Sequence, residues 1–460
     1  MQKIIVQNFG AINYAEIDIK NITILIGEQA TGKSTIAQLV YFFKSLQRDI
    51  TQDIYRDLEN ILFQQTYIQR SNIVYQTIIQ SIQNKFRVYF GSTRYLSDNF
   101  DVKFYFSDTA ENHIHLYKNN TLRITFGNNF DINGLKGKIT NLIDSFKTIN
   151  FIRQNAAIVL PQLETLLVNY FEENGRSHFF ESAYIPAGRN ITTGYSDLFQ
   201  DYFQKNYQLY EYKQNKEKET KSVIMELLNS FMTLVTEINS EIVANGGTLQ
   251  KYISINQHKF TNRPEIVDFM EKIGLILKAK YLIERRNNTY EEYLELPNHA
   301  KIALNQTSSG QQEAIRILQD LFLITANKKN TYRIIEEPEA HLFPTAQKNL
   351  VDLFAIATNI SESKFFITTH SPYILSSFNN LLLAGQAAAV NTEQTTNAGY
   401  PSYLCLNTNQ FSAYQMNEDG TITPILENGL INVNGMDGVS FELGVKLDEL
   451  WDIANPQNEN

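Results

Sequence analysis

The residues with the clearest capacity for chemistry form one segment near the start of the chain, Gly27-Glu28-Gln29-Ala30-Thr31-Gly32-Lys33-Ser34, which Thr35 follows. The segment fits the G-x-x-x-x-G-K-S pattern of a phosphate-binding loop. A loop framed by glycines that enters a helix presents consecutive backbone N–H groups to a polyphosphate. We expect Lys33 to contact the β- and γ-phosphates and the Ser34 hydroxyl to bind Mg²⁺. The pattern therefore predicts a nucleotide-binding site.

The residues on either side of this loop predict the elements that would position it. Asn21–Ile26 form an apolar run that is typical of a strand buried on both faces. After the loop, apolar residues recur at the spacing of an amphipathic helix, at Ile36, Leu39, Val40 and Phe43. The alternative is a chance match in a glycine-containing turn, which this strand, loop and helix context makes less favoured.

A second candidate lies in the segment Thr307–Glu313, which we expect to begin a helix. Ser309 and Gln312 have the spacing of a capping box, which would make this an ordinary helix start. The alternative is that the free N–H groups around Ser309 and Gly310, at the positive end of the helix dipole, bind a γ-phosphate. Taken alone, the segment leaves both interpretations open.

Two predicted strands end in polar residues that suit a magnesium-nucleotide site. The short apolar strand that includes Arg333, Ile334 and Ile335 leads to Glu336, which could hold Mg²⁺, and to Glu337, which could orient and polarise the attacking water. The run Lys364–Thr369 leads to His370, which could donate a hydrogen bond to the γ-phosphate or the water. A strand that exits to solvent could also end in such residues, but the ordered set favours one site.

These residues give the chain a specific resemblance to a known family. It resembles the ABC-type ATPases of the RecF/SMC-like group, and most closely the ATPase portion of overcoming-lysogenization-defect (OLD) proteins. The matching segments are Gly27–Ser34 for Walker A, Ser308–Gln312 for the signature, Ile334–Glu337 for Walker B, Glu339–His341 for the D-loop and His370 for the switch histidine. Two departures are Glu336, where Asp is usual, and the signature, which reads Ser-Ser-Gly-Gln-Gln.

The resemblance implies an α/β fold, namely a P-loop ABC-type ATPase head with a β-rich N-terminal part and a helical insertion. It implies ATP and Mg²⁺ as cofactors, with Ser34 and Glu336 at the metal, and Glu337 and His370 at the attacking water and the γ-phosphate. In this family the signature caps a nucleotide on a partner's Walker A, so Ser309, Gly310 and Gln312 imply a homodimer or a higher homo-oligomer.

The resemblance also implies a place in a bacterial anti-phage defence system, where the ATPase would control a separate effector protein. OLD nucleases carry a Toprim domain with a D-x-D motif, and none occurs after residue 370. We therefore expect no nuclease in this chain. The alternative is a RecF-like DNA-repair clamp, for which DNA would be a partner, and a non-enzymatic nucleotide-binding scaffold is the third hypothesis.

We expect three parts: an N-terminal ATPase lobe at 1–196, a mostly helical insertion at 197–278 and a C-terminal ATPase lobe at 279–460. The insertion has an apolar helical stripe that includes Phe231 and Val235, and its mixed charges at Lys213–Lys221 favour a solvated helix face over a DNA contact. The C-terminal lobe should include a hairpin at Phe411–Leu426 and a last helix at Val445–Ile453. Phe9 could stack on adenine, or be an ordinary core residue.

Composition excludes several classes of protein. The chain has 460 residues, enough for a large core, and its 43% hydrophobic and 19% charged residues are ordinary for a globular protein. Its net charge of −9 provides no global basic field for nucleic acid. Cys405 is the only cysteine, which excludes intrachain disulfides. No apolar run approaches the roughly 20 residues that span a bilayer, and we expect a cytoplasmic protein that does not enter a membrane.

Overall fold

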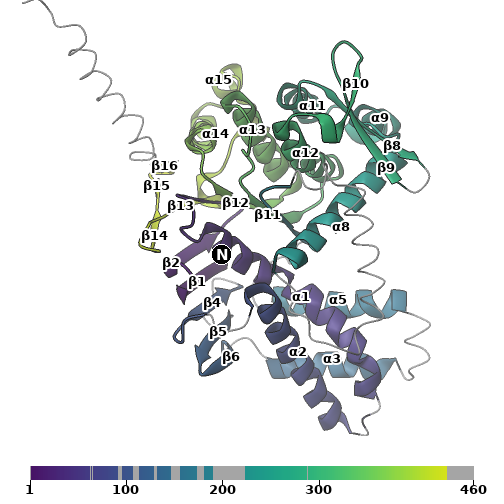
Figure 1. The fold of residues 1–460 in the computed structure, drawn as a ribbon, viewed down its shortest axis with the longest axis vertical. Coiled ribbons are helices and arrows are strands. Elements are labelled where there is room, and N and C mark those ends of the chain that lie inside the picture. The colour runs from purple at the N-terminus through teal and green to yellow at the C-terminus, as the bar shows by residue number, and fades with distance from the viewer. Residues whose placement is uncertain are drawn as a thin grey trace, which may run out of the picture.

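A six-stranded sheet lies at the centre of the computed structural model (Figure 1), in the strand order β14-β13-β3-β12-β11-β7. The structure describes residues 2–62, 64, 66–91, 96–106, 113–128, 132–146, 156–173, 181–189, 223–286 and 289–432. The strands of this sheet are β3 (Ile22–Gly27), β7 (Glu181–Ile185), β11 (Thr331–Glu336), β12 (Lys364–Thr369), β13 (Phe411–Met416) and β14 (Ile422–Pro424). All neighbours pair in parallel except β14, which forms the predicted hairpin with β13.

Hydrophobic residues cover both faces of this sheet. Successive side chains of a strand point to opposite faces, and here they enter two different clusters. Ile24, Ile335 and Ile367 join the first cluster, whereas their neighbours Leu25 and Ile334 join the second. This arrangement explains why the strands are apolar runs rather than alternating patterns.

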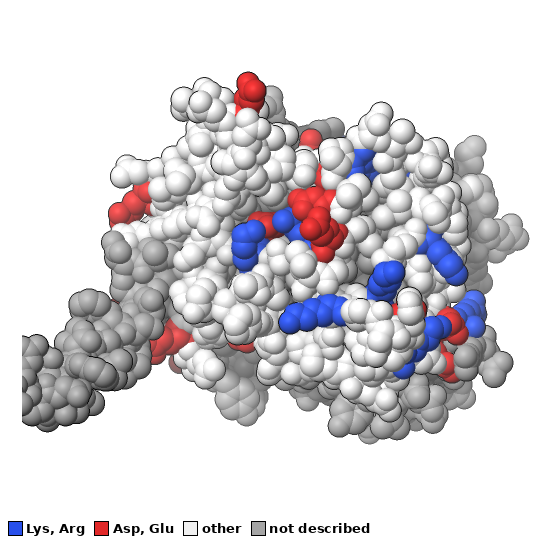
Figure 2. All heavy atoms as spheres, turned by 90° about the horizontal axis from the view of Figure 1, so that it is seen from above, with Lys and Arg blue, Asp and Glu red and all other residues white. Residues whose placement is uncertain are grey.

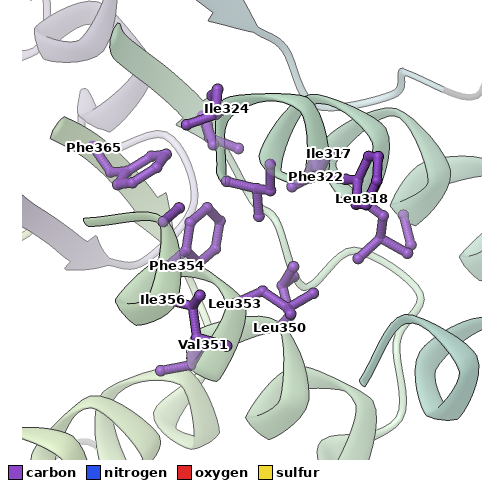
Figure 3. Packing of buried hydrophobic residues seen from close by; sticks show 14 of the residues in the cluster. Ile317, Leu318, Phe322, Ile324, Leu350, Val351, Leu353, Phe354, Ile356 and Phe365 are labelled. Atoms are coloured by element: carbon purple, nitrogen blue, oxygen red, sulfur yellow. The ribbon is translucent and has the colours of Figure 1, made fainter. Parts of the chain in front are cut away.

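Helices of the C-terminal half supply most of the first cluster. They are α8 (Val223–Ala244), α11 (Pro264–Leu277), α12 (Ser309–Asn327), α13 (Pro344–Ser361) and α14 (Pro372–Val390). In Figure 3, side chains of α12 such as Leu318 and Phe322 face those of α13, and Phe354 of α13 lies against Phe365 of β12. The described helices of the predicted insertion pack into this same cluster, through Phe231 and Phe269 among others.

The second cluster joins the central sheet to an antiparallel sheet with the order β2-β1-β4-β5-β6. Its strands are β1 (Gln2–Phe9), β2 (Ile12–Ile19), β4 (Asp101–Tyr105), β5 (His113–Asn119) and β6 (Thr121–Phe126), and its helices are α1 (Lys33–Leu62), α2 (Tyr67–Phe90), α3 (Ile132–Ser145) and α5 (Ala156–Glu173). Phe9 is 1% exposed and packs edge-on against Phe86, Phe90 and Phe100. It is therefore a core residue, and the adenine-stacking alternative is wrong for this conformation.

The remaining described elements are short. They are α9 (Leu249–Ile255), α10 (Gln257–Phe260), β8 (Lys280–Arg286), β9 (Thr289–Glu295), β10 (Lys301–Ala303), η2 (Leu304–Gln306), α15 (Thr392–Asn397), η3 (Ser402–Leu404), η4 (Thr408–Gln410), β15 (Leu426–Glu427) and β16 (Leu430–Ile431). The charge cluster Lys213–Lys221 and the last predicted helix, Val445–Ile453, lie outside the described residues. Among the helices that are described, none is long and apolar enough to cross a membrane. The division into three parts stays a prediction.

Candidate nucleotide-binding and hydrolysis site

Three parallel strands end side by side at the edge of the sheet where the predicted site residues lie. In the ladder between β3 and β12, Ile26 is opposite Thr369, and between β11 and β12, Glu336 is opposite Thr368. The segments that follow these strands therefore leave the same edge, the carboxyl edge, where ligands bind in open α/β sheets. Folding thus brings Gly27, Glu337 and His370 to one place from distant parts of the chain.

The phosphate-binding loop has the backbone shape that its glycines permit. Gly32 has a φ of 105°, which disfavours any other residue, and a Cβ on Gly27 would lie 2.7 Å from the carbonyl oxygen of Met416. Ile36 N–H donates to the Gly32 carbonyl (3.0 Å) as α1 begins. The predicted binding residues thus run from Gly27, the last residue of β3, through the connecting turn to Thr35 in the first turn of α1. Glu28, Gln29, Ala30 and Ser34 are exposed.

Lys33 lies across this turn. Its Nζ donates to the carbonyl oxygen of Gly27 (2.8 Å) and to that of Glu28, while the Thr31 hydroxyl also donates to Glu28 (2.9 Å). Burial lowers the pKa of Lys33, and the negative charges of Glu337, Glu339, Glu28 and Glu336 oppose this effect. The ammonium therefore lies within the field of the acidic residues that follow β11.

Glu336 has the environment expected of a metal ligand. It is 8% exposed, its Oε2 accepts the Ala187 N–H (3.2 Å), and its Oε1 is buried without a hydrogen bond of normal geometry. An oxygen of this kind fits Mg²⁺, a hard cation that prefers oxygen ligands. Among the described residues, no group of three or more His, Cys, Asp or Glu could hold a metal by itself.

Glu337 and His370 face each other at this edge. Oε1 of Glu337 lies 3.1 Å from Nε2 of His370, and both side chains are partly exposed. Glu337 has a φ of 42°, and its N–H donates to the Thr368 carbonyl (2.9 Å), so that its side chain leaves the strand direction. Non-glycine residues are uncommon in this backbone region, and such outliers cluster at active sites.

Glu339 accepts hydrogen bonds from the end of β12 and from the backbone of His370. Its Oε1 accepts the Thr369 hydroxyl (2.6 Å) and the backbone N–H of His370 (2.8 Å). Glu339 is 9% exposed, and burial raises the pKa of its carboxyl, although these two hydrogen bonds act in the opposite direction. The carboxyl thus connects the loop after β11 to the end of β12.

Arg189, which the sequence reasoning did not select, is buried next to the backbone of Glu336 and Glu337. It follows β7, is 0% exposed, and donates to the carbonyl oxygens of Glu336 (2.8 Å) and Glu337 (2.9 Å). It also donates to the carbonyl oxygens of Pro186 (3.1 Å) and Glu313 (3.0 Å). The available signal was an arginine placed a few residues after a buried strand, where burial of its charge requires nearby acceptors.

The signature segment begins α12, but its cap differs from the expectation. Ser308 is the N-cap and forms a capping box with Gln311, so the expected pairing of Ser309 with Gln312 is wrong by one residue. Gln312 instead donates to the carbonyl oxygen of Thr307 (2.8 Å). Ser308 and Ser309 are exposed at the start of this helix.

Gly310 lies where the start of α12 packs closely against the loop after β11. A Cβ on Gly310 would lie 2.5 Å from the carbonyl oxygen of His341, so only glycine allows α12 to pack this closely on the loop after β11. His341 has a φ of 59° in that loop. The first turn of α12 is therefore held directly against the segment that carries Glu337 and Glu339.

Solved structures of SMC heads are similar to this chain at low sequence identity. The chain resembles the SMC head bound to the C-winged helix domain of ScpA, at 9% identity over 92% of this chain and 96% of that one, with a TM-score of 0.38. It also resembles the Smc head of Pyrococcus furiosus with an extended coiled coil, bound to the C-terminal domain of ScpA (12% identity, 96% and 100% coverage, TM-score 0.37). The SMC head from Thermotoga maritima is similar at 9% identity, 92% and 98% coverage and a TM-score of 0.33.

No curated protein matches the chain. The profile of a protein family, described as the AAA ATPase domain, matches residues 1–375, which include the segments predicted as Walker A, signature and Walker B and also His370. The predicted α/β class and ATPase activity are confirmed, while the closer relation to OLD proteins stays a hypothesis. With most of its length matched to that profile, this chain belongs to the AAA ATPase domain family.

Proposed function

We propose that this ATPase is an ABC-type head of the RecF/SMC-like kind, which uses Mg²⁺-dependent ATP hydrolysis as a conformational switch. The observation that carries the proposal is the meeting of Lys33, Glu336 and the Glu337–His370 pair at the ends of three adjacent parallel strands. Each member alone has a structural interpretation. Their convergence at one edge supports a catalytic one.

The loop residues Gly27 to Thr35 would bind the phosphates of ATP. Consecutive N–H groups at the start of α1 are suited to anions, and Lys33 would exchange its carbonyl partners for the β- and γ-phosphate oxygens. Ser34 and Glu336 would hold Mg²⁺, which supplies charge neutralisation on those oxygens when it is bound. The buried Oε1 of Glu336 has no hydrogen bond of normal geometry, and the buried Tyr184 hydroxyl lies near the same carboxylate. This buried oxygen is the feature that favours the metal role.

Glu337 would orient the attacking water and accept its proton. A positioned base must lie within hydrogen-bond reach of the proton that it takes, and the left-handed backbone of Glu337 turns its partly exposed side chain out of the strand. His370, 3.1 Å from this carboxylate, would hold its orientation and contact the γ-phosphate.

The signature residues would act on a second copy of the chain. Ser309 is exposed at the start of the 19-residue helix α12, where N–H groups and the helix dipole favour an anion. We infer a homodimer or higher homo-oligomer in which Ser309, Gly310 and Gln312 of one copy contact the nucleotide on the other copy's loop.

The biological role rests on resemblance. We propose that the ATP-driven change controls a separate effector protein in bacterial anti-phage defence. A RecF-like role on DNA is the alternative, and the net charge of −9 does not favour it. Figure 2 shows one face, on which a group of Asp and Glu side chains lies near the centre and Lys and Arg side chains are spread over the right-hand part.

Size-exclusion chromatography of the Glu337→Gln variant with and without Mg²⁺-ATP tests the switch. The proposal expects a monomer without nucleotide and a stable dimer with it, while Lys33→Ala stays monomeric in both conditions. An elution volume that ATP does not change would contradict the switch. ATP turnover that rises with added DNA and falls steeply with salt would support the DNA role instead.

A further inference from the structure

The guanidinium of Arg189 joins three elements of the site from inside the protein. Nη1 donates to the carbonyl oxygen of Glu336, the last residue of β11, and Nη2 donates to that of Glu337, which follows the strand. Nε donates to the carbonyl oxygen of Glu313 in α12 and lies 3.4 Å from the Glu313 carboxylate. The donors of a guanidinium are fixed in one plane. Arg189 therefore holds α12 and the end of β11 in a fixed orientation relative to each other.

Hydrogen bonds restrain Glu337, the residue with a left-handed backbone (φ 42°). The carbonyl oxygen of Glu337 is held by Arg189, and its N–H by the carbonyl oxygen of Thr368. Left-handed backbone at a non-glycine residue is strained and persists only where the surroundings restrain it. Arg189 supplies one of these two backbone hydrogen bonds, so it contributes to where the Glu337 carboxylate points.

Burial of this charge has a cost that its acceptors must offset. A buried charge without hydrogen-bond or ion-pair partners destabilises the folded state. Arg189 has such partners, namely four carbonyl oxygens and the Glu313 carboxylate. Burial lowers the pKa of Arg189, and the charges of Glu313, Glu339, Glu337 and Glu336 oppose this. An apolar side chain in this place would leave the four carbonyl oxygens and the Glu313 carboxylate without their donor, so the site requires directed donors here.

We propose that Arg189 is a positioning residue for ATP hydrolysis, which fixes the backbone of Glu337 and ties it to the first turns of the signature helix. Movement of α12 would then be transmitted to Glu337 by two routes, through Glu313 and Arg189, and through the close contact between Gly310 and His341. The inference rests on the role proposed above for Glu337.

The test measures kcat, KM and ATP affinity for Arg189→Lys, which keeps the charge but loses the planar set of donors. We expect kcat to fall by about 10- to 100-fold, as for a small misplacement of a catalytic group, with ATP affinity nearly unchanged. The matched control is Arg333→Lys. Arg333 is also buried, lies on β11 and pairs through two hydrogen bonds with Asp320, away from the catalytic edge. It should lose thermal stability to a similar extent and keep its kcat.

A double variant separates positioning from folding. Because Arg189 acts through Glu337, Arg189→Lys combined with Glu337→Gln should be no slower than Glu337→Gln alone, whereas two independent effects would multiply. If Arg189→Lys fails to fold, Glu313→Gln keeps the Glu313 carbonyl and weakens only the ion pair, and it should lower kcat without changing affinity. A kcat like the wild type in folded Arg189→Lys, or multiplied losses, overturns the inference. Normal turnover by Glu337→Gln would instead overturn the role proposed for Glu337.

Discussion

The Oε1 atom of Glu337 lies 3.1 Å from the Nε2 atom of His370, although the two residues follow different strands of the central sheet. The contact exists because β11 and β12 are parallel neighbours that end at the same level. It places a carboxylate and an imidazole together beside the phosphate-binding loop. This pair is the part of the site on which a water molecule could be oriented for attack.

We expect Glu337→Gln to bind ATP normally and to hydrolyse it at least about 100-fold more slowly, the usual contribution of a positioned base. Glutamine keeps the size of the side chain and the contact with His370 but accepts a proton poorly. Single-turnover hydrolysis and ATP titration measure the two effects separately. The matched control is Glu336→Gln, which should raise the Mg²⁺ concentration needed for activity. If these two phenotypes were exchanged, the assignments of Glu336 and Glu337 would be exchanged too.

Lys33→Ala should remove most ATP binding. Lys33 bonds to the carbonyl oxygens of Gly27 and Glu28 within the loop, and its ammonium is the charge that could move onto the phosphates. Isothermal titration calorimetry measures the affinity directly. Lys301→Ala, which removes an exposed lysine of β10, is the control and should bind like the wild type. Wild-type affinity in Lys33→Ala would refute the assignment of the loop.

Sequence patterns were sufficient where the structure is local. The apolar runs predicted β3, β11 and β12, because a strand buried on both faces is apolar along its length. The helical spacing of apolar residues after Ser34 predicted α1, because one face of that helix is buried. The order of the strands depends on pairing between distant segments. The position of β12 between β3 and β11, and with it the contact of Glu337 with His370, could not be predicted from local patterns alone.

Two details of the site also depended on tertiary packing. The segment Ser308–Gln312 contains two serine-to-glutamine pairs at capping-box spacing, and the packing of Gly310 on His341 accompanies the choice of Ser308 as the cap. Arg189 offered no periodic signal, because its role depends on carbonyl groups of β11 and α12 that only folding brings near.

Glu339→Gln should stabilise the protein more at neutral than at acidic pH. Burial raises the pKa of Glu339, so the folded state holds this proton more tightly than the unfolded state does. Stability from this group is thus fully present below the unfolded pKa of about 4.3 and is lost as pH rises through the raised value. Glutamine removes that loss and can still accept the hydrogen bonds from Thr369 and His370.

Thermal denaturation between about pH 4 and pH 7 measures this difference. The gain in Tm of Glu339→Gln over the wild type should grow as pH rises across this interval. Glu393→Gln, at an exposed position of α15, is the control and should show no such trend. A Tm difference that is constant or shrinks with rising pH would contradict the protonation behaviour assigned to Glu339.

The last prediction tests whether the site is shared between two copies. Ser309 is exposed at the start of α12, so Ser309→Arg should leave this copy's own loop able to bind ATP while blocking its fit over a partner's nucleotide. Alone, Ser309→Arg should bind ATP without hydrolysing it, and Lys33→Ala should do neither. A mixture of the two variants contains heterodimers in which one site combines an intact loop with an intact signature helix. Turnover should therefore return, to roughly a quarter of the wild-type level if subunits mix at random and the sites act independently. Lack of recovery, despite heterodimers confirmed by mass, would count against sites shared between two copies.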